Sequence, residues 1–298
     1  MTDKKNFTLT KRPDGFAIHF FAMASECEVI IETSKKSLAK KLGQIVSDEV
    51  WRIQDKYSRY DPKSICSKIN KSKGQAIKLD NETYLLLNFA DTCYQLSDGL
   101  FDITSGVLRK IWRFDCSDKI PSQTQINALL PYIGWSKVIF DKETIVLPEN
   151  MEIDLGGIGK EYAVDRCIIL AQKLTNKPVL INLGGDLAAT SSRKNNQAWH
   201  VGVEHPGLLE KQHMIVSLHK GAIATSGDAK RYLLKGDVRY SHILNAKTGW
   251  PIENAPRSIT VTAPQCIQAG ILATLSSMQG ENAEDYLEEQ GIKFWAIR

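Results

Sequence analysis

The chain has 298 residues, of which 43% are hydrophobic and 24% are charged. This is the composition of an ordinary globular protein that can bury a full core. The formal net charge is only +4, and the basic residues are spread along the chain, so no nucleic-acid partner is expected. No apolar run reaches the length of a membrane span, so no membrane segment is expected either.

The cysteines and the first residues bear on the cellular compartment. The six cysteines are scattered, without CxxC or Cys/His ligand spacing, which predicts reduced and mostly buried thiols and argues against zinc. The first fifteen residues, MTDKKNFTLTKRPDG, contain neither the apolar stretch of an export signal nor a lipobox-like cysteine. A cytoplasmic location is therefore expected, with the periplasm as the alternative if a leader has been removed.

The apolar periodicity predicts a mixture of strands and helices. Residues 1–15 are expected to form a flexible tail in front of a single domain at 16–298. The first half is predicted to hold two strands within 16–31, helices at 37–55, 81–97 and 126–130, loops at 58–70 and 99–106, and a hairpin of 138–146 with 151–155. The second half is predicted to hold a helix from about residue 160, strands at 178–182, 199–204, 214–218, 222–228, 239–244 and 258–263, and helices at 266–278 and 283–290.

This order lacks strict alternation of strands and helices and therefore favours an α+β fold. The strands are expected to meander, with mixed or antiparallel pairing and helices on their flanks. The chain shows no linker-like segment and no repeat of fixed period. A single domain, with two lobes around a cleft, is the simplest interpretation.

The stretch at 152–166, EIDLGGIGKEYAVDR, combines a strand-like run, a glycine turn and the start of an amphipathic helix. Such a turn can bring bare backbone N–H groups close to an anion. Asp154 before the turn adds an acceptor, and Lys160 after it adds a cation. The glycine spacing matches neither GxxxxGK[ST] nor GxGxxG, so the stretch is a candidate nucleotide cradle of another kind, with a plain connection as the alternative.

Three predicted strand ends share one pattern of glycine and acid: IDLGG at 153–157, INLGGD at 181–186 and TSGD at 225–228. Glycine and aspartate are common turn residues, which is the simpler explanation. Three such ends together would also suit a diphosphate held with Mg²⁺, because glycine permits close backbone approach and carboxylates can hold a metal or a ribose.

Three further side chains are candidates for binding or chemistry. His242 lies in the polar segment RYSHIL and could serve as an acid/base group or a phosphate contact, although a structural histidine is the more frequent case. Tyr60 and Phe101 lie in loops flanked by acids. They could stack on a planar ring, with the edge of the core as the alternative.

Taken together, these stretches resemble the FAD:protein FMN transferase family, also called the ApbE family. The resemblance extends from about residue 23 to residue 280. It rests on blocks in a fixed order: the loop at Met23, SRYDPKSICSKIN at 58–70, GLFDITSG at 99–106, IDLGGIGKEYAVDR at 153–166, INLGGDL at 181–187, AIATSGD at 222–228, RYSHILNAKTGWPI at 239–252 and TVTAPQCIQAGILAT at 260–274.

The resemblance implies a reaction and a set of contacts. Members of this family cleave the diphosphate of FAD, attach FMN to a Thr or Ser hydroxyl of an acceptor protein and release AMP. A divalent cation, usually Mg²⁺, would neutralise the diphosphate. The implied FAD contacts are Met23, Tyr60, Leu100, Phe101, Asp102, Asp154, Lys160, His242 and Ile243. The implied metal ligands are the Gly157 carbonyl and the Thr274 hydroxyl.

One position departs from the family pattern. The last block usually reads A-D-x-L-x-T, in which the Asp is the charged metal ligand, but here that position is Gly270. A carbonyl and a hydroxyl alone hold a hard dication poorly, so weak Mg²⁺ binding is expected unless Asp186, Asp228 or a water replaces the acid. Restoring it with G270D is expected to raise metal affinity. The alternatives are an FAD-binding protein that has lost transfer, and an enzyme that hydrolyses FAD to FMN and AMP.

Overall fold

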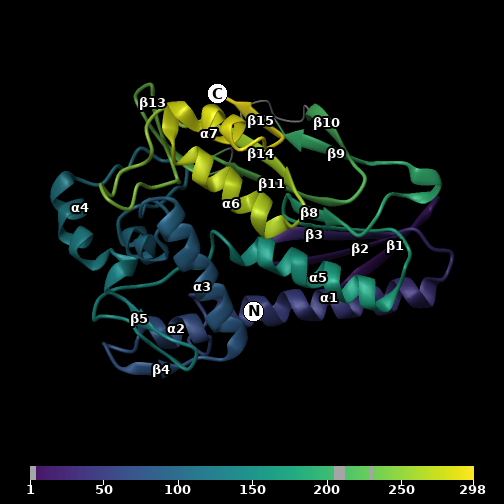
Figure 1. Cartoon of the computed structure of the whole chain (residues 1–298), viewed down its shortest axis with the longest axis horizontal. Helices are drawn as coiled ribbons and strands as arrows, with labels where there is room; N and C mark the ends of the chain where they lie inside the picture. The colour runs from purple at the N-terminus through teal and green to yellow at the C-terminus, as the bar shows by residue number, and fades with distance from the viewer. Residues whose placement is uncertain (1–4, 205–211, 229–230) are drawn as a thin grey trace.

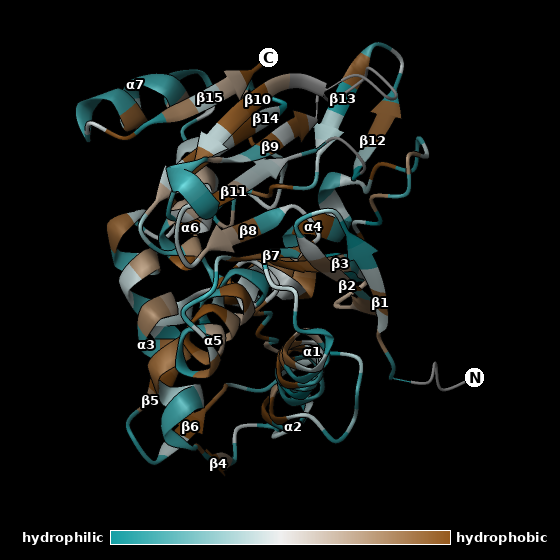
Figure 2. Ribbon diagram, turned by 90° about the vertical axis from the view of Figure 1, so that its right-hand side faces the viewer, coloured by the Kyte–Doolittle hydropathy of each residue, from teal (hydrophilic) through white to brown (hydrophobic). Residues whose placement is uncertain are grey.

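The computed structural model describes residues 5–204, 212–228 and 231–298. Its centre is an eight-stranded sheet in which all neighbouring strands run antiparallel. In spatial order the strands are β1 (Thr8–Arg12), β2 (Gly15–Ala22), β3 (Ser25–Ile31), β7 (Val179–Leu183), β8 (Asp186–Ala189), β11 (Gly221–Gly227), β14 (Ser258–Ala263) and β15 (Phe294–Ile297). Figure 2 shows them stacked from β1 up to β15.

One face of this sheet carries the main core. Alternate residues along a strand point to opposite faces, so on β7 the side chains of Val179, Ile181 and Leu183 join the main cluster while Leu180 joins a smaller one behind the sheet. Three long helices cover the main face (Figures 1 and 2): α1 (Lys36–Tyr57), α5 (Gly159–Leu174) and α6 (Cys266–Ser277). A short helix, α7 (Ala283–Glu289), packs against α6.

The opposite face is covered by the hairpin of β9 (Trp199–Glu204) and β10 (Gln212–Leu218). Trp199 of this hairpin packs against Leu180 and Ile223, and all three side chains are buried. The sheet is therefore buried on both faces here, which explains why β7 and β8 carry buried apolar residues on both faces.

A second lobe lies beside the helical layer (Figure 1). It contains α2 (Ile65–Asn70), α3 (Asn81–Leu96), a small sheet of β4 (Ala76–Lys78), β6 (Thr144–Val146) and β5 (Ile139–Phe140), the 3₁₀ helix η1 (Ile103–Lys110), α4 (Gln123–Leu129), and the hairpin of β12 (Tyr232–Lys235) and β13 (Val238–Ser241). Trp112 is central to a separate apolar cluster that includes Leu108, Ile126 and Leu233.

The α+β prediction is confirmed by this arrangement. All six cysteines are free, and only Cys116 is exposed. No helix in the described parts of the chain is both long and apolar enough to cross a membrane. The expected N-terminal tail contains an ordered strand, because β1 pairs along its whole length with β2.

The predicted strand at 151–155 is wrong. This segment joins no sheet. The Asn70 side chain accepts a hydrogen bond from the Ile153 N–H at 2.8 Å and donates to the Ile153 carbonyl at 3.0 Å. The Asp154 N–H donates to the carbonyl of Ile103 at 2.8 Å. The segment has the apolar alternation of a strand. Its backbone N–H and C=O groups, however, form hydrogen bonds with residues of the second lobe and not with a partner strand.

The sequence also misses several elements. Helix α2 lies inside the predicted loop at 58–70, and η1 begins inside the loop at 99–106. Strands β8, β12 and β15 have no counterpart in the predicted order. All of these are short, so their periodicity is weak and tertiary packing decides them.

A network of charged groups joins α1, α3 and α5. Glu82 on α3 accepts hydrogen bonds from Arg52 and Lys56 of α1, at 2.7 and 2.6 Å, and from the Tyr162 hydroxyl of α5, also at 2.6 Å. Burial alone would raise the pKa of the Glu82 carboxyl, but these donors hold it well below its usual range. The network therefore stabilises the helical layer only while Glu82 is ionised.

Glu82→Gln is expected to lower the free energy of unfolding at pH 7 by about 1–3 kcal/mol. Since the depressed pKa stabilises the folded state above the unfolded pKa of about 4.5 and this stability is lost as the pH falls, the wild-type and variant curves should converge at acidic pH. Urea unfolding between pH 3 and 8 measures this. The exposed control Glu149→Gln should follow the wild type at every pH, and parallel curves for Glu82→Gln would contradict the prediction.

Candidate functional site

A cavity of about 590 Å³ lies between the second lobe and the end of the helical layer. It is lined by Arg59, Tyr60, Phe101, Asp102, Ile103, Ser105, Gly106, Arg109, Trp112, Arg113, Phe114, Asp154, Gly156, Gly157, Ser226, Arg231, His242, Ile243, Leu244, Thr274 and Met278. These residues come from the loop after α1, from η1 and the residues on either side of it, from the turn before α5, from β11, from the segment after β13, and from α6 and its end. The cavity therefore exists only in the folded chain.

The glycine turn before α5 forms one wall of the cavity. Asp154 fixes this turn, because its Oδ1 accepts the N–H of Gly156 at 2.9 Å. A Cβ at Gly106 would lie 2.8 Å from the Asp154 Cβ, so the close approach of η1 to this turn requires a glycine. Gly156 and Gly157 both line the cavity, as the sequence predicts for the anion-facing part of this stretch.

Arginines give the cavity its positive charge. Arg59 and Arg109 both contact the Asp154 Oδ2, at 3.0 and 3.1 Å, so one carboxylate is shared by two cations. Arg113 and Arg231 add two more guanidinium groups to the lining. Because the cations outnumber the acids, the cavity suits a ligand with at least two negative charges.

Aromatic side chains line both the entrance and the inner wall. Tyr60 is 78% exposed, and the Arg59 guanidinium lies 5.2 Å from its ring centroid. The exposed ring is open to stacking on a planar ligand. On the inner side, the rings of Trp112 and Phe114 stack in parallel with centroids 5.6 Å apart. The Trp112 Nε1 donates to the Gly249 carbonyl at 2.9 Å, which fixes this wall.

His242 lies at the edge of the aromatic wall, and its ring is 6.3 Å from that of Phe114. Burial and the nearby Arg231 lower the pKa of His242 to about 4. The imidazole is therefore neutral at physiological pH and can accept a proton. Its Nδ1 is buried and has no hydrogen-bond partner among the described residues, which leaves that atom available to a ligand.

The structure brings together most of the residues implied for FAD. Tyr60, Phe101, Asp102, Asp154, His242 and Ile243 line the cavity, as do the implied metal ligands Gly157 and Thr274. Met23, Leu100 and Lys160 are not among the lining residues. Met23 packs against the main core at the turn between β2 and β3.

Asp102 lines the cavity, but its carboxylate is engaged within the protein. It accepts hydrogen bonds from the N–H and hydroxyl of Thr104, at 2.7 and 2.6 Å, and from the Trp135 N–H at 2.8 Å. Burial raises the pKa of this carboxyl. Asp102 therefore fixes the start of η1, and so the position of Phe101.

The acids expected to replace the missing carboxylate at position 270 are engaged elsewhere. Asp186 accepts a hydrogen bond from the Lys160 ammonium. Asp228 forms an ion pair with Arg239, whose Nε lies 2.9 Å from its Oδ2. Neither acid lines the cavity, because each balances a cation in its own part of the fold.

A different acid lies against Gly270. Glu161 of α5 is buried, and its Oε1 would lie only 2.9 Å from a Cβ placed on Gly270. Burial, and then the negative charge of Asp186, raise the pKa of Glu161 to about 8. No group of three or more His, Cys, Asp or Glu is arranged as a metal site within the described ranges.

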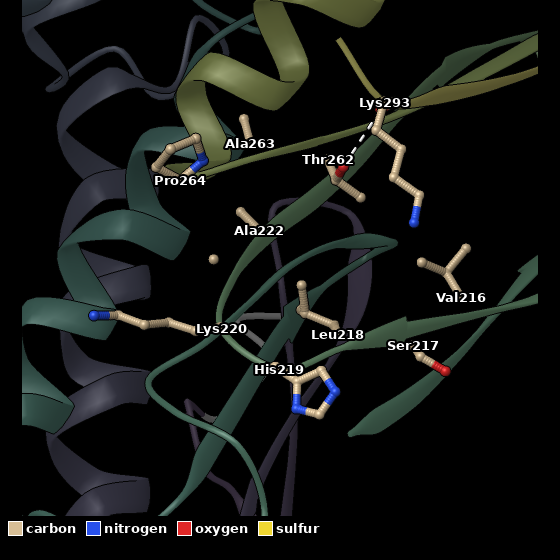
Figure 3. A pocket seen from close by; sticks show the side chains of 11 residues that line it. Val216, Ser217, Leu218, His219, Lys220, Ala222, Thr262, Ala263, Pro264 and Lys293 are labelled. Atoms are coloured by element: carbon tan, nitrogen blue, oxygen red, sulfur yellow. Dashed lines mark hydrogen bonds between the residues drawn. The ribbon is translucent and has the colours of Figure 1, made fainter. Parts of the chain in front are cut away.

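A second cavity of about 430 Å³ lies between β10, β11 and β14 (Figure 3). Lys220 and Lys293 lie on opposite sides of it in that view. Its lining contains neither a carboxylate nor a Phe, Tyr or Trp ring. The larger cavity, which combines aromatic rings, cations and a neutral histidine, is therefore the candidate active site.

The sequence profile of the ApbE family matches residues 23–295. This chain belongs to the ApbE family. A relative from Vibrio cholerae named FAD:protein FMN transferase is 27% identical over 253 residues, which cover 83% of this chain and 74% of the relative. A relative of the same name from Haemophilus influenzae is 25% identical over 281 residues, covering 90% and 80% of the two chains.

Solved structures of ApbE proteins share this fold. The ApbE protein of Thermotoga maritima superposes with a TM-score of 0.85 at 28% identity, covering 98% of this chain and 94% of that chain. The flavinyl transferase ApbE of Pseudomonas stutzeri superposes with a TM-score of 0.83 at 24% identity, covering 98% and 92%. At 24% identity, this second superposition supports only the shared fold.

Sequence reasoning missed several residues of this ApbE site. The sequence motifs do not single out the lining arginines Arg59, Arg109, Arg113 and Arg231. Arg59 directly precedes Tyr60, and VLRKIWRF at 107–114 continues the glycine-bracketed block at 99–106. This alternation of basic and aromatic residues is the sequence pattern that indicates a binding surface for an anionic ligand with a planar ring. Glu161 had no such signal, because it looks like an ordinary first-turn acid of a helix.

Asp165 fixes α5 against α6. Its two carboxylate oxygens accept the N–H groups of Cys266 and Ile267, at 2.8 and 2.9 Å, and so cap the N-terminus of α6 from a neighbouring helix. The residue at the N-cap position, Gln265, makes no capping hydrogen bond with its side chain. Asp165 therefore helps to fix Thr274 of α6 relative to the glycine turn of α5.

Asp165→Ala is expected to lower the free energy of unfolding by about 1–2 kcal/mol, because two buried N–H groups lose their acceptor. Denaturant titration measures the loss. Gln265→Ala is the matched control and should leave stability within about 0.5 kcal/mol of the wild type. Equal stability of the two variants would show that the cap contributes nothing.

Proposed function

We propose that this protein is an FAD:protein FMN transferase that attaches FMN to a Thr or Ser hydroxyl of an acceptor protein and releases AMP. The observation that carries the proposal is the cavity itself, in which ring surfaces, arginines and a neutral imidazole converge. Membership of the ApbE family and the names of its curated relatives support this chemistry over other uses of such a cavity.

The cavity wall accounts for how FAD would bind. Tyr60 and Phe101 offer ring surfaces for the planar parts of the dinucleotide. Asp154 holds the guanidinium groups of Arg59 and Arg109 at the cavity wall. From this position both groups can turn toward the diphosphate of a bound FAD. Planar guanidinium groups suit phosphate oxygens, to which they can donate two hydrogen bonds at once.

The transfer step needs an acceptor for one proton. The hydroxyl oxygen of the acceptor protein forms a bond to the phosphorus that carries riboflavin, the bond from that phosphorus to the AMP oxygen breaks, and the hydroxyl proton moves to His242. The unpartnered Nδ1 of His242 can take this proton. The arginines then stabilise the negative charge that develops on AMP.

A divalent cation fits the proposed site. Gly157 and Thr274 both line the cavity; the implied ligands are their carbonyl and hydroxyl oxygens, and oxygen ligands are what Mg²⁺ prefers. When bound, the cation would neutralise diphosphate charge. The buried and unpartnered carboxyl oxygen of Glu161, beside the space at Gly270, indicates that this part of the fold can accept such an ion.

The decisive experiment incubates the protein with FAD, Mg²⁺ and a protein extract of its source cells, followed by peptide mass spectrometry. We expect FMN adducts on Thr or Ser residues together with AMP release. The His242→Ala variant serves as the blank. AMP release without any adduct would instead indicate FAD hydrolysis. FAD binding with neither product would indicate a binding protein that has lost transfer, and either result would overturn the proposal.

His242→Ala is expected to lower the transfer rate by about 10²–10⁴-fold, because the proton acceptor is lost. Because the pKa of His242 is about 4 in the free protein, kcat/KM should be constant from about pH 8 down to about pH 5 and should fall below that as the imidazole becomes protonated. Steady-state AMP release across this range measures both effects. A step near pH 6.5 that vanishes in the variant would contradict the low pKa.

Tyr60→Ala is expected to weaken FAD binding by about tenfold, which is the loss of one stacking surface. Tyr60→Phe keeps the ring and should bind FAD within about twofold of the wild type. Quenching of flavin fluorescence measures both affinities. Equal affinity of the Ala and Phe variants would show that the exposed ring does not stack on FAD.

A further inference from the structure

We propose that Glu161, projecting from α5, supplies the carboxylate for the divalent cation and thereby replaces the acid that α6 lacks at position 270. The inference rests on the proposed function, because it assumes that the cavity holds a cation beside the diphosphate. The charged ligand would thus come from α5 instead of α6, and the other proposed ligands, Gly157 and Thr274, would stay the same.

The first argument is steric. A Cβ added to Gly270 would lie 2.6 Å from the Glu161 Cγ, 2.9 Å from its Oε1 and 3.1 Å from its Cδ. The Glu161 side chain therefore fills the space that a side chain at position 270 would enter. Only glycine at position 270 leaves room for this carboxylate, so the two residues are matched to each other.

The second argument concerns hydrogen bonding. Buried carboxyl oxygens almost always have a partner, yet the Glu161 Oε2 is buried and has none among the described residues. Leaving a carboxyl group in this state costs stability. A cation ligated by that oxygen would satisfy it. The neighbouring Lys160 ammonium does not, because it donates to Asp186 instead.

The third argument is position within the two helices. Gly270 and Thr274 are four residues apart on α6 and therefore lie on the same helix face. Gly157 lies four residues before Glu161, in the turn that opens α5. Glu161 itself is not among the residues that line the cavity. Its carboxyl lies against Gly270, on the α6 face to which Thr274 belongs.

This geometry reverses the sequence expectation for G270D. With Glu161 in place, an aspartate at position 270 would overlap its side chain and would put a second carboxylate in the same buried space. G270D alone is therefore expected to destabilise the protein instead of raising its metal affinity. Removing the Glu161 side chain first should make the aspartate acceptable.

The experiment measures Mn²⁺ binding to the full chain by the electron paramagnetic resonance signal of the free ion, with and without FAD. Glu161→Gln keeps the shape of the side chain but removes its charge, and it is expected to weaken Mn²⁺ binding by at least about tenfold. The fold should persist, because the amide fills the same buried space beside Gly270. Circular dichroism checks this.

Three further variants, Glu152→Gln, E161G and E161G/G270D, sharpen the test. Glu152→Gln removes an acid that pairs with Lys110 outside the cavity lining, and it should leave Mn²⁺ affinity within about twofold of the wild type. The double variant E161G/G270D moves the carboxylate back to α6 and should bind Mn²⁺ at least about tenfold more tightly than E161G, as expected for regaining a charged oxygen ligand.

Each outcome tests the role of Glu161 in metal binding independently of whether the protein transfers FMN. Equal Mn²⁺ affinity of wild type and Glu161→Gln would overturn the inference, even if FMN transfer proceeds. The absence of Mn²⁺ binding to the wild type, with FAD present or absent, would overturn it as well. Loss of Mn²⁺ binding in Glu161→Gln and its recovery in the double variant would support it, even if no transfer to any acceptor is found.

Discussion

The contact between α5 and α6 is the constraint on which the candidate site depends. Helix α5 carries the glycine turn at its start, and α6 carries Thr274 near its end. Asp165 caps α6 from α5, and the absence of a side chain at Gly270 lets Glu161 lie between the two helices. Packing in protein interiors is dense enough that such a contact fixes both helices. The wall shared by Gly157 and Thr274 is therefore set by residues that are not themselves part of the cavity lining.

The second lobe completes the cavity from the other side through the same turn. The Asp154 N–H is bonded to η1, and its carboxylate holds Arg59 and Arg109. One aspartate thus joins the turn before α5, the loop after α1 and η1. Segments scattered over most of the chain therefore line a single cavity. The helical layer holds one wall of this cavity against the antiparallel sheet. The apolar cluster around Trp112 supports the other wall.

Two buried acids of this fold each lie close to a cation. Lys160 pairs with Asp186 and Arg239 pairs with Asp228, and these pairs account for both acids that the sequence offered as replacements at position 270. The Glu161 carboxyl differs from these two acids, since one of its oxygens has no hydrogen-bond partner within the described residues. A buried ionisable group without a partner is costly. The proposed metal contact would offset this cost, whereas the satisfied pairs need no ligand.

The sequence by itself determined the family, the α+β class and most of the long elements, because apolar periodicity and ordered motifs depend on neighbouring residues. It also selected Tyr60, Phe101, Asp154 and His242, which lie in such motifs. Only the tertiary structure decided that residues 151–155 join no sheet, that Met23 and Lys160 stay out of the cavity wall, and that Glu161 fills the space at Gly270. The physical reason is that these facts depend on which backbone groups and side chains meet in the folded chain. Asn70 and Ile153 are 83 positions apart, and Glu161 contacts a residue of another helix, so no local pattern records such a meeting.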